Sequence, residues 1–188
     1  MNKCTIIYGM SGSLKLTTIN SKKYENSFKI LSDTKPFFSI DKNYFNWSSS
    51  PNDAHLCIHR LLTLELQGYL PDNKDVIIER GITDNIFCIP NRKLRGLEDY
   101  SKINIKGLVD RELNDLSKYK LKKILLVMND SNFITNEVLK DKYRKSLYND
   151  VSIYMKKQQD YIDFTCKYNL IDEIIRIDNA FDYINKLK

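Results

Sequence analysis

The stretch Gly9-Met10-Ser11-Gly12-Ser13-Leu14-Lys15-Leu16-Thr17-Thr18 comes directly after a short apolar run at residues 4–8. The apolar run predicts a strand that ends at Gly9, and the polar residues 15–23 predict a helix. A strand, a glycine-containing loop and a helix in this order can wrap backbone N–H groups around phosphates, with a lysine for the β- and γ-phosphates. The stretch therefore predicts a phosphate loop, and the candidate binding residues are Gly9, Ser11, Gly12, Ser13, Lys15, Thr17 and Thr18.

This loop departs from the pattern G-x-x-x-x-G-K-[ST] at two positions. Leu14 stands in place of the second glycine, and Leu16 stands where a hydroxyl normally binds magnesium. Thr17 supplies a hydroxyl one residue later, about 100° further around the helix. On the loop alone, an ordinary Gly/Ser turn beside an incidental lysine stays open as the alternative, and metal coordination is the weaker part of the interpretation.

The rest of the chain alternates between strand-like and helix-like segments. Apolar runs predict strands at residues 28–31, 75–78, 123–128 and 173–177, and helical periodicity fills the intervals, including one continuous helix over residues 147–165. This order predicts an α/β protein of the P-loop NTPase type, a three-layer sandwich with about five parallel strands and helices on both faces. Ligands of such sheets bind at the carboxyl ends of the strands.

Length and composition favour a single domain over residues 1–188, with 42% hydrophobic and 29% charged residues. No apolar run approaches the roughly 20 residues of a membrane span, and the first residues lack the pattern of a secretory signal, so we expect a cytoplasmic protein. A net charge of +6 suits a polyanionic small molecule and nucleic acid alike. The cysteines lie singly, which predicts reduced core residues at Cys4, Cys57, Cys88 and Cys166.

A second motif lies at the end of the third predicted strand. The residues Val76-Ile77-Ile78-Glu79-Arg80-Gly81, followed by Ile82-Thr83-Asp84-Asn85-Ile86-Phe87, resemble the E-R-S…F segment of deoxynucleoside kinases and the D-R segment of thymidylate kinases. Both families are P-loop kinases with a phosphate loop at the first strand. The resemblance extends over nearly the whole chain in its order of elements, and the two short motifs are its specific part.

The resemblance implies roles for individual residues. Glu79 would hold Mg²⁺ directly or through water, and Arg80 would contact the transferring phosphate or its acceptor. Asp33 lies where these kinases carry an acidic residue that orients or deprotonates the acceptor hydroxyl. A basic, lid-like segment at about residues 130–146 follows the fourth strand, and Arg144 is its leading candidate for neutralising charge on the phosphates.

We therefore expect an ATP-dependent kinase of a deoxynucleoside or deoxynucleoside monophosphate, with ATP and Mg²⁺ as cofactors and Lys15, Asp33, Arg80 and Arg144 as catalytic residues. A catalytically weak or inactive nucleotide-binding protein, acting as sensor or interaction module, is the alternative that Leu14 and Leu16 support. The expected partner is a nucleoside or nucleotide substrate, and we expect no membrane association. A polynucleotide end as acceptor, a nucleic-acid partner and a homodimer all stay open.

Overall fold

The computed structural model of the chain describes residues 1–30, 70–81 and 105–188. Its strands are β1 Lys3–Tyr8, β2 Phe28–Ile30, β3 Val76–Glu79, β4 Lys120–Met128 and β5 Glu173–Ile177. Its α-helices are α1 Lys15–Ile19, α5 Ile105–Asp115, α6 Ser131–Phe133, α7 Lys142–Tyr148, α8 Val151–Lys167 and α9 Ala180–Leu187. Two short helical turns complete the described elements. The 3₁₀ turn η1 Lys22–Tyr24 is tighter than an α-helix, and the π-helical turn η3 Ile134–Val138 is wider.

The five strands form one parallel sheet in the order β2-β3-β1-β4-β5. β1 lies at its centre, with Ile7 opposite Glu79 of β3 and Ile124 of β4. Both faces of β1 are covered, because its apolar residues Cys4, Ile6, Ile7 and Tyr8 are almost fully buried. This burial explains why the strand is a continuous apolar run instead of an alternating one.

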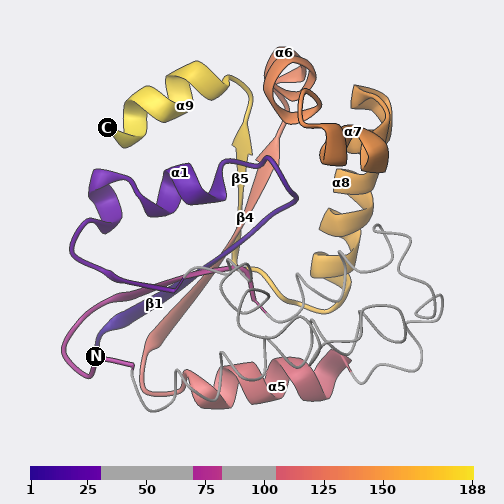
Figure 1. Cartoon of the computed structure of the whole chain (residues 1–188). Helices are drawn as coiled ribbons and strands as arrows, with labels where there is room; N and C mark the ends of the chain where they lie inside the picture. The colour runs from indigo at the N-terminus through magenta and orange to yellow at the C-terminus, as the bar shows by residue number, and fades with distance from the viewer. Residues whose placement is uncertain (31–69, 82–104) are drawn as a thin grey trace, which may run out of the picture.

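Helices cover both faces of the sheet (Figure 1). α1 and α9 lie on one face, where the Thr18 and Tyr183 hydroxyls are 2.8 Å apart. α5 and α8 lie on the other face. Gln158 of α8 accepts a hydrogen bond from the N–H of Met128 and donates one to its carbonyl, at 2.8 and 2.9 Å. The predicted α/β three-layer sandwich with a five-stranded parallel sheet is therefore confirmed.

The predicted continuous helix over residues 147–165 is wrong, because the chain breaks it into α7 and α8. Asn149 between the two has a positive φ of 56°, which no right-handed helix allows. The Asp150 carboxylate then accepts a hydrogen bond from the N–H of Ile153, which caps a new helix. α8 is the longest described helix, and none in the described part is long and apolar enough to cross a membrane.

Two smaller expectations are also corrected. Cys4 is buried in the core as predicted, but Cys166 is exposed at the end of α8, and Cys57 and Cys88 lie outside the described residues. The strand predicted at residues 123–128 begins three residues earlier, since β4 starts at Lys120. Lys118, Lys122 and Lys123 each pair with an acidic neighbour, as in the 2.7 Å pair of Lys122 and Glu173.

Asp130 ties the end of β4 to two helices. One carboxylate oxygen accepts a hydrogen bond from the N–H of Phe133 at 2.9 Å, and the other accepts one from the N–H of Ala180 at 2.8 Å. These backbone hydrogen bonds, first that of Ala180 and then that of Phe133, lower the pKa of Asp130 below its ordinary value. The ionised carboxylate thus fixes α6 and α9 on the same strand end.

Replacing Asp130 by Ala should lower the free energy of unfolding at neutral pH by about 2 kcal/mol, since a helix cap and a second hydrogen bond are lost. Because the native pKa is lowered, this stabilisation is present above the unfolded-state pKa of about 4 and is lost as the pH falls through the native value. Urea titrations at several pH values check this. Asp160→Ala, on an exposed part of α8, is the control; a gap between the variants that stays constant down to low pH would contradict the prediction.

Candidate functional site

The loop between β1 and α1 turns back on itself at two glycines. Gly9 has φ 150° and Gly12 has φ 91°, and the N–H of Ser13 donates to the carbonyl of Met10 at 3.2 Å. A Cβ at Gly12 would lie 2.6 Å from a methyl of Val138, and one at Gly9 would collide with the Ser13 side chain. Both positions therefore require glycine for space as well as for backbone conformation.

Leu14 adopts a left-handed conformation, with φ 59° and ψ 23°, immediately before α1 begins. This is the position at which the phosphate-loop pattern has its second glycine. For a residue with a side chain, the conformation costs roughly 1–2 kcal/mol. The Leu14 side chain is partly buried and packs against the core, which offsets some of that cost. Leu14 thus adopts the backbone conformation that glycine favours, although it carries a side chain.

Lys15 folds back over this loop. Its ammonium group donates to the carbonyls of Gly9 and Met10 at 2.6 and 2.7 Å and lies 3.5 Å from the Ser13 hydroxyl. The side chain is only 5% exposed. A buried ammonium group is stable only when hydrogen-bonded, and here the loop's own carbonyls provide the partners. The positive charge is consequently held at the centre of the loop.

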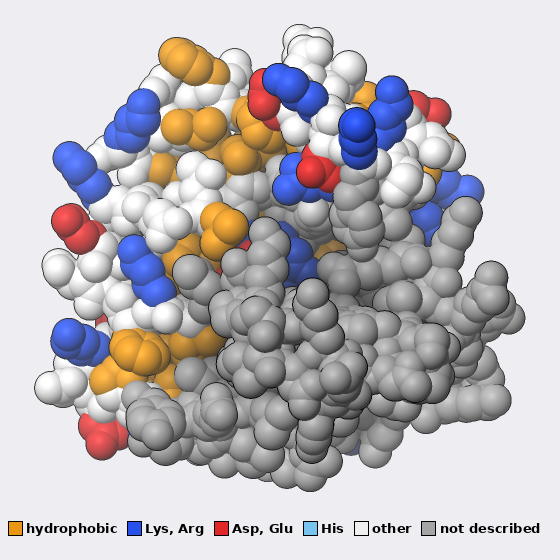
Figure 2. All heavy atoms as spheres, viewed as in Figure 1, with side chains coloured by type: hydrophobic (Ala, Val, Ile, Leu, Met, Phe, Trp, Pro, Cys, Tyr) orange, Lys and Arg blue, Asp and Glu red, His pale blue; other side chains and the backbone are white. Residues whose placement is uncertain are grey.

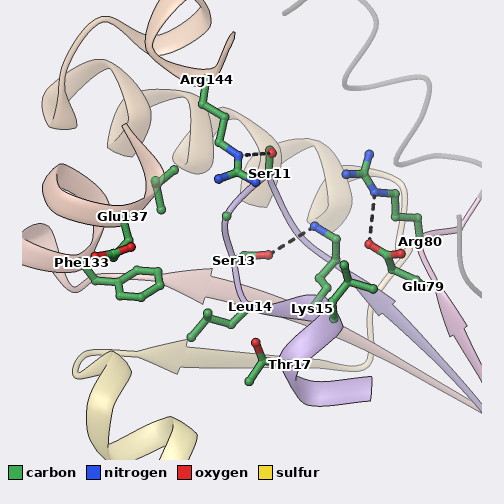
Figure 3. A pocket seen from close by; sticks show the side chains of 13 residues that line it. Ser11, Ser13, Leu14, Lys15, Thr17, Glu79, Arg80, Phe133, Glu137 and Arg144 are labelled. Atoms are coloured by element: carbon green, nitrogen blue, oxygen red, sulfur yellow. Dashed lines mark hydrogen bonds and ion pairs between the residues drawn. The ribbon is translucent and has the colours of Figure 1, made fainter. Parts of the chain in front are cut away.

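A cavity of about 360 Å³ opens over the loop (Figure 3). It lies at the carboxyl ends of β1 and β3, the edge at which parallel sheets of this type bind ligands. The turn η3 and helix α7 close its other side. Its lining residues are Ser11, Gly12, Ser13, Leu14, Lys15, Leu16, Thr17, Glu79, Arg80, Phe133, Glu137, Val138 and Arg144.

Glu79 and Arg80 reach the cavity from the end of β3. Glu79 is the last residue of the strand and is 8% exposed. Arg80 follows with a left-handed backbone, φ 69°, and its N–H donates to the carbonyl of Ile7 at 2.9 Å. The Arg80 Nε lies 3.9 Å from a Glu79 carboxylate oxygen. The strained turn therefore presents a carboxylate and a guanidinium group side by side at the cavity wall.

Arg144 reaches the cavity from α7. Its Nε donates to the Ser11 hydroxyl at 3.0 Å, so this residue touches the loop directly (Figure 3). Lysines around it are exposed, and Lys and Arg side chains gather over α6 and α7 in the upper right of Figure 2. The exposed members of this group are Lys140, Lys142 and Lys145. The basic segment predicted at about residues 130–146 thus places one arginine at the loop and its lysines in solvent.

The cavity brings together most of the candidate residues. Ser11, Gly12, Ser13, Lys15, Thr17, Glu79, Arg80 and Arg144 line it, and Gly9 lies beneath them with its carbonyl bonded to Lys15. The Thr18 hydroxyl is bonded elsewhere, at 3.0 Å from the Leu14 carbonyl and 2.8 Å from the Tyr183 hydroxyl. Asp33 lies outside the described residues.

Sequence reasoning missed Phe133, Glu137 and Val138 on the far wall. They belong to the short helix α6 and to η3, where the N–H of Leu139 donates to the carbonyl of Ile134, five residues back, at 2.9 Å. Such widened π-type turns often occur at functional sites, but they leave no periodic signature in a sequence. The only available signal was the position of the segment directly after the fourth strand.

The charges of the cavity favour an anion. Lys15, Arg80 and Arg144 contribute three positive charges against two from Glu79 and Glu137. Within the described ranges, no group of three or more His, Cys, Asp or Glu side chains could hold a metal ion by itself. A cation in this cavity would therefore have to share its coordination with oxygens of a ligand.

Leu14 offers a direct test of the loop conformation. Leu14→Ala and Leu14→Gly both remove the packing of the leucine, but only glycine relieves the left-handed strain. We expect the glycine variant to have the higher free energy of unfolding, by about 1 kcal/mol. Chemical denaturation of both variants measures this difference. An alanine variant that is the more stable of the two, the usual order at right-handed positions, would contradict the loop geometry.

Comparisons with known proteins agree with this architecture. No family model matches the chain, and no curated protein sequence matches it. Among solved structures, the thymidylate kinase from Candida albicans is similar, with a TM-score of 0.59 and 19% sequence identity over 99% of this chain and 89% of that one. At this identity the likeness establishes the fold. The chain has the P-loop NTPase fold that the order of its strands and helices predicted.

Proposed function

We propose that this chain transfers a phosphoryl group from ATP to a deoxynucleoside or a deoxynucleoside monophosphate. The observation that carries the proposal is the convergence of Lys15, Arg80 and Arg144 on one cavity beside the buried carboxylate of Glu79. These residues come from three segments far apart in the sequence. The similar structure named above is a thymidylate kinase, which makes a nucleoside monophosphate the first acceptor to test.

Lys15 and the loop bind the donor phosphates in this proposal. The carbonyls of Gly9 and Met10 hold the ammonium group inside the loop, so the charge and the loop N–H groups act on the same phosphate oxygens. Phosphoryl transfer needs little covalent help from a protein and depends on positioning and on neutralising charge. The held lysine contributes to both, because its position is set before the ligand arrives.

Arg80 and Arg144 neutralise negative charge from two further directions. Guanidinium groups suit this task since they stay protonated and donate several hydrogen bonds from one plane. Arg80 stands at the strand end where the acceptor would lie, and Arg144 stands on the opposite wall. Asp33 remains our proposed residue for orienting the acceptor hydroxyl.

The residues present are compatible with Mg²⁺ bound together with a nucleotide. Mg²⁺ is commonly held by one or two protein carboxylates together with phosphate oxygens and water. The Glu79 carboxylate, which lines the cavity, would hold it together with phosphate oxygens and water. Bound there, the ion would neutralise charge on the phosphates.

Phosphoryl transfer from radiolabelled ATP in the presence of magnesium tests the proposal, with a panel of nucleosides and monophosphates as acceptors. We expect labelled product with at least one deoxynucleoside or its monophosphate. Lys15→Met keeps much of the side-chain length but removes the charge, and it should lower the rate at least about 100-fold. Binding of ATP without transfer to any member of the panel would sink the kinase assignment.

A second function, nucleotide binding with little or no transfer, is favoured by one observation. Leu16 is 50% exposed and lines the cavity at the position where the loop pattern supplies a hydroxyl for magnesium. An apolar side chain cannot replace a water ligand of the ion. Binding would then depend on the three cations more than on the metal.

Leu16→Thr and Leu16→Val form a matched pair that tests this position, because the two side chains have similar size and only threonine carries a hydroxyl. Magnesium should tighten ATP binding in both variants, and we expect the factor to be at least about threefold larger for threonine than for valine. The added hydroxyl ligand should contribute at least as much binding free energy as one weak hydrogen bond. Titration of a fluorescent ATP analogue with magnesium or EDTA measures the effect. Equal magnesium dependence in both variants would show that residue 16 lies away from the metal.

A further inference from the structure

Ser11 of the loop is held by two residues that lie more than 130 positions away in the sequence. The Arg144 Nε of α7 donates to its hydroxyl at 3.0 Å, and the Tyr154 hydroxyl of α8 donates to its carbonyl at 3.2 Å. Arg144 lines the cavity, whereas Tyr154 is not one of the lining residues and lies behind the loop. The loop is therefore fixed from its outer side by a residue that no phosphate would touch.

Tyr154 also holds α7. Its ring meets the ring of Tyr148 edge-on, with centroids 5.1 Å apart and an interplanar angle of 76°. Tyr148 is the last residue of α7, the helix that carries Arg144. Tyr154 is 0% exposed, and Tyr148 is buried beside it. One side chain thus contacts both the loop and the helix whose arginine reaches that loop.

The hydrogen bond to the Ser11 carbonyl sets the direction of the next amide. In a trans peptide the carbonyl and the following N–H point in opposite directions, and the described chain has no cis peptide. Because Tyr154 draws the Ser11 carbonyl toward α8, the Gly12 N–H points away from α8. Gly12 lines the cavity, and its φ of 91° is accessible because it has no Cβ.

The Ser11–Gly12 peptide would be easy to flip without this hydrogen bond. Glycine accepts backbone conformations on both sides of the φ/ψ map, so the glycine itself resists a flip only weakly. The Tyr154 hydroxyl is a dependable donor here, since burial, followed by the nearby Tyr148, raises the pKa of Tyr154 well above its ordinary value, although Arg144 opposes the shift. It stays protonated throughout the neutral range.

We propose that Tyr154 is a positioning residue for phosphate binding: it locks the Ser11–Gly12 peptide so that the Gly12 N–H serves the cavity, and it holds Arg144 in place through Tyr148. This inference rests on the proposed nucleotide function. It adds a residue outside the cavity that determines whether the loop binds phosphate well.

Tyr154→Phe tests the inference, because it removes the hydroxyl and keeps the ring against Tyr148. Tyr161→Phe is the matched control, since Tyr161 is an equally buried tyrosine on α8 that is not among the cavity-lining residues. The probes are inorganic tripolyphosphate and ATP, titrated calorimetrically against the full chain. We expect Tyr154→Phe to weaken both ligands about fivefold, as the loss of one hydrogen bond would, and Tyr161→Phe to leave both unchanged.

The Gly12 amide signal in a ¹⁵N-resolved NMR spectrum gives a second readout that general loosening would not produce. It should shift on addition of tripolyphosphate in the wild type and in Tyr161→Phe, and shift much less in Tyr154→Phe. Wild-type protein that binds neither ligand would overturn the proposed function and this inference together. Wild-type binding with no difference between the two variants would overturn this inference and leave the proposed function standing.

Discussion

The central position of β1 is the constraint on which the rest of the structure depends. β3 and β4 pair with it on either side, and helices cover both of its faces, so the strand has no freedom to shift. The chain leaves it at Gly9 and must turn at once, and the Lys15 ammonium group holds that turn through the carbonyls of Gly9 and Met10. Every residue of the candidate site is positioned relative to this fixed end of β1.

Much of the fold could be predicted because its signals are local. Apolar runs such as residues 4–8 and 123–128 have few stable alternatives to buried parallel strands once helices alternate with them. The break at Asn149 was missed because the apolar period continues across it, while the positive φ of Asn149 and the Asp150 cap interrupt the helix. Hydrophobic periodicity carries no information about either feature.

The candidate site was predictable at the strand ends and, on the opposite wall, at Arg144 alone. Lys15, Glu79 and Arg80 follow strand ends, where residue type and position together indicate function. Glu137 lies in the five-residue turn η3 and Phe133 directly before it, and Tyr154 depends on a contact across the fold, so no sequence spacing points to them. Departures from a motif were also weak guides: Leu14 adopts the conformation of the glycine it replaces, whereas Leu16 places an apolar group where a ligand of the metal was expected.

The bond between the Thr18 and Tyr183 hydroxyls has a consequence for biosynthesis. It joins the helix after the loop to α9, which ends one residue before the last residue of the described chain. Chains emerge from the ribosome amino end first, so the loop leaves the exit tunnel long before its brace does. β4 and β5, which are needed beside β1 and beneath α9, also emerge late. Nascent chains should therefore gain the braced form of the loop between β1 and α1 only after α9 has left the exit tunnel, and an early stop that removes α9 would leave this loop without its support.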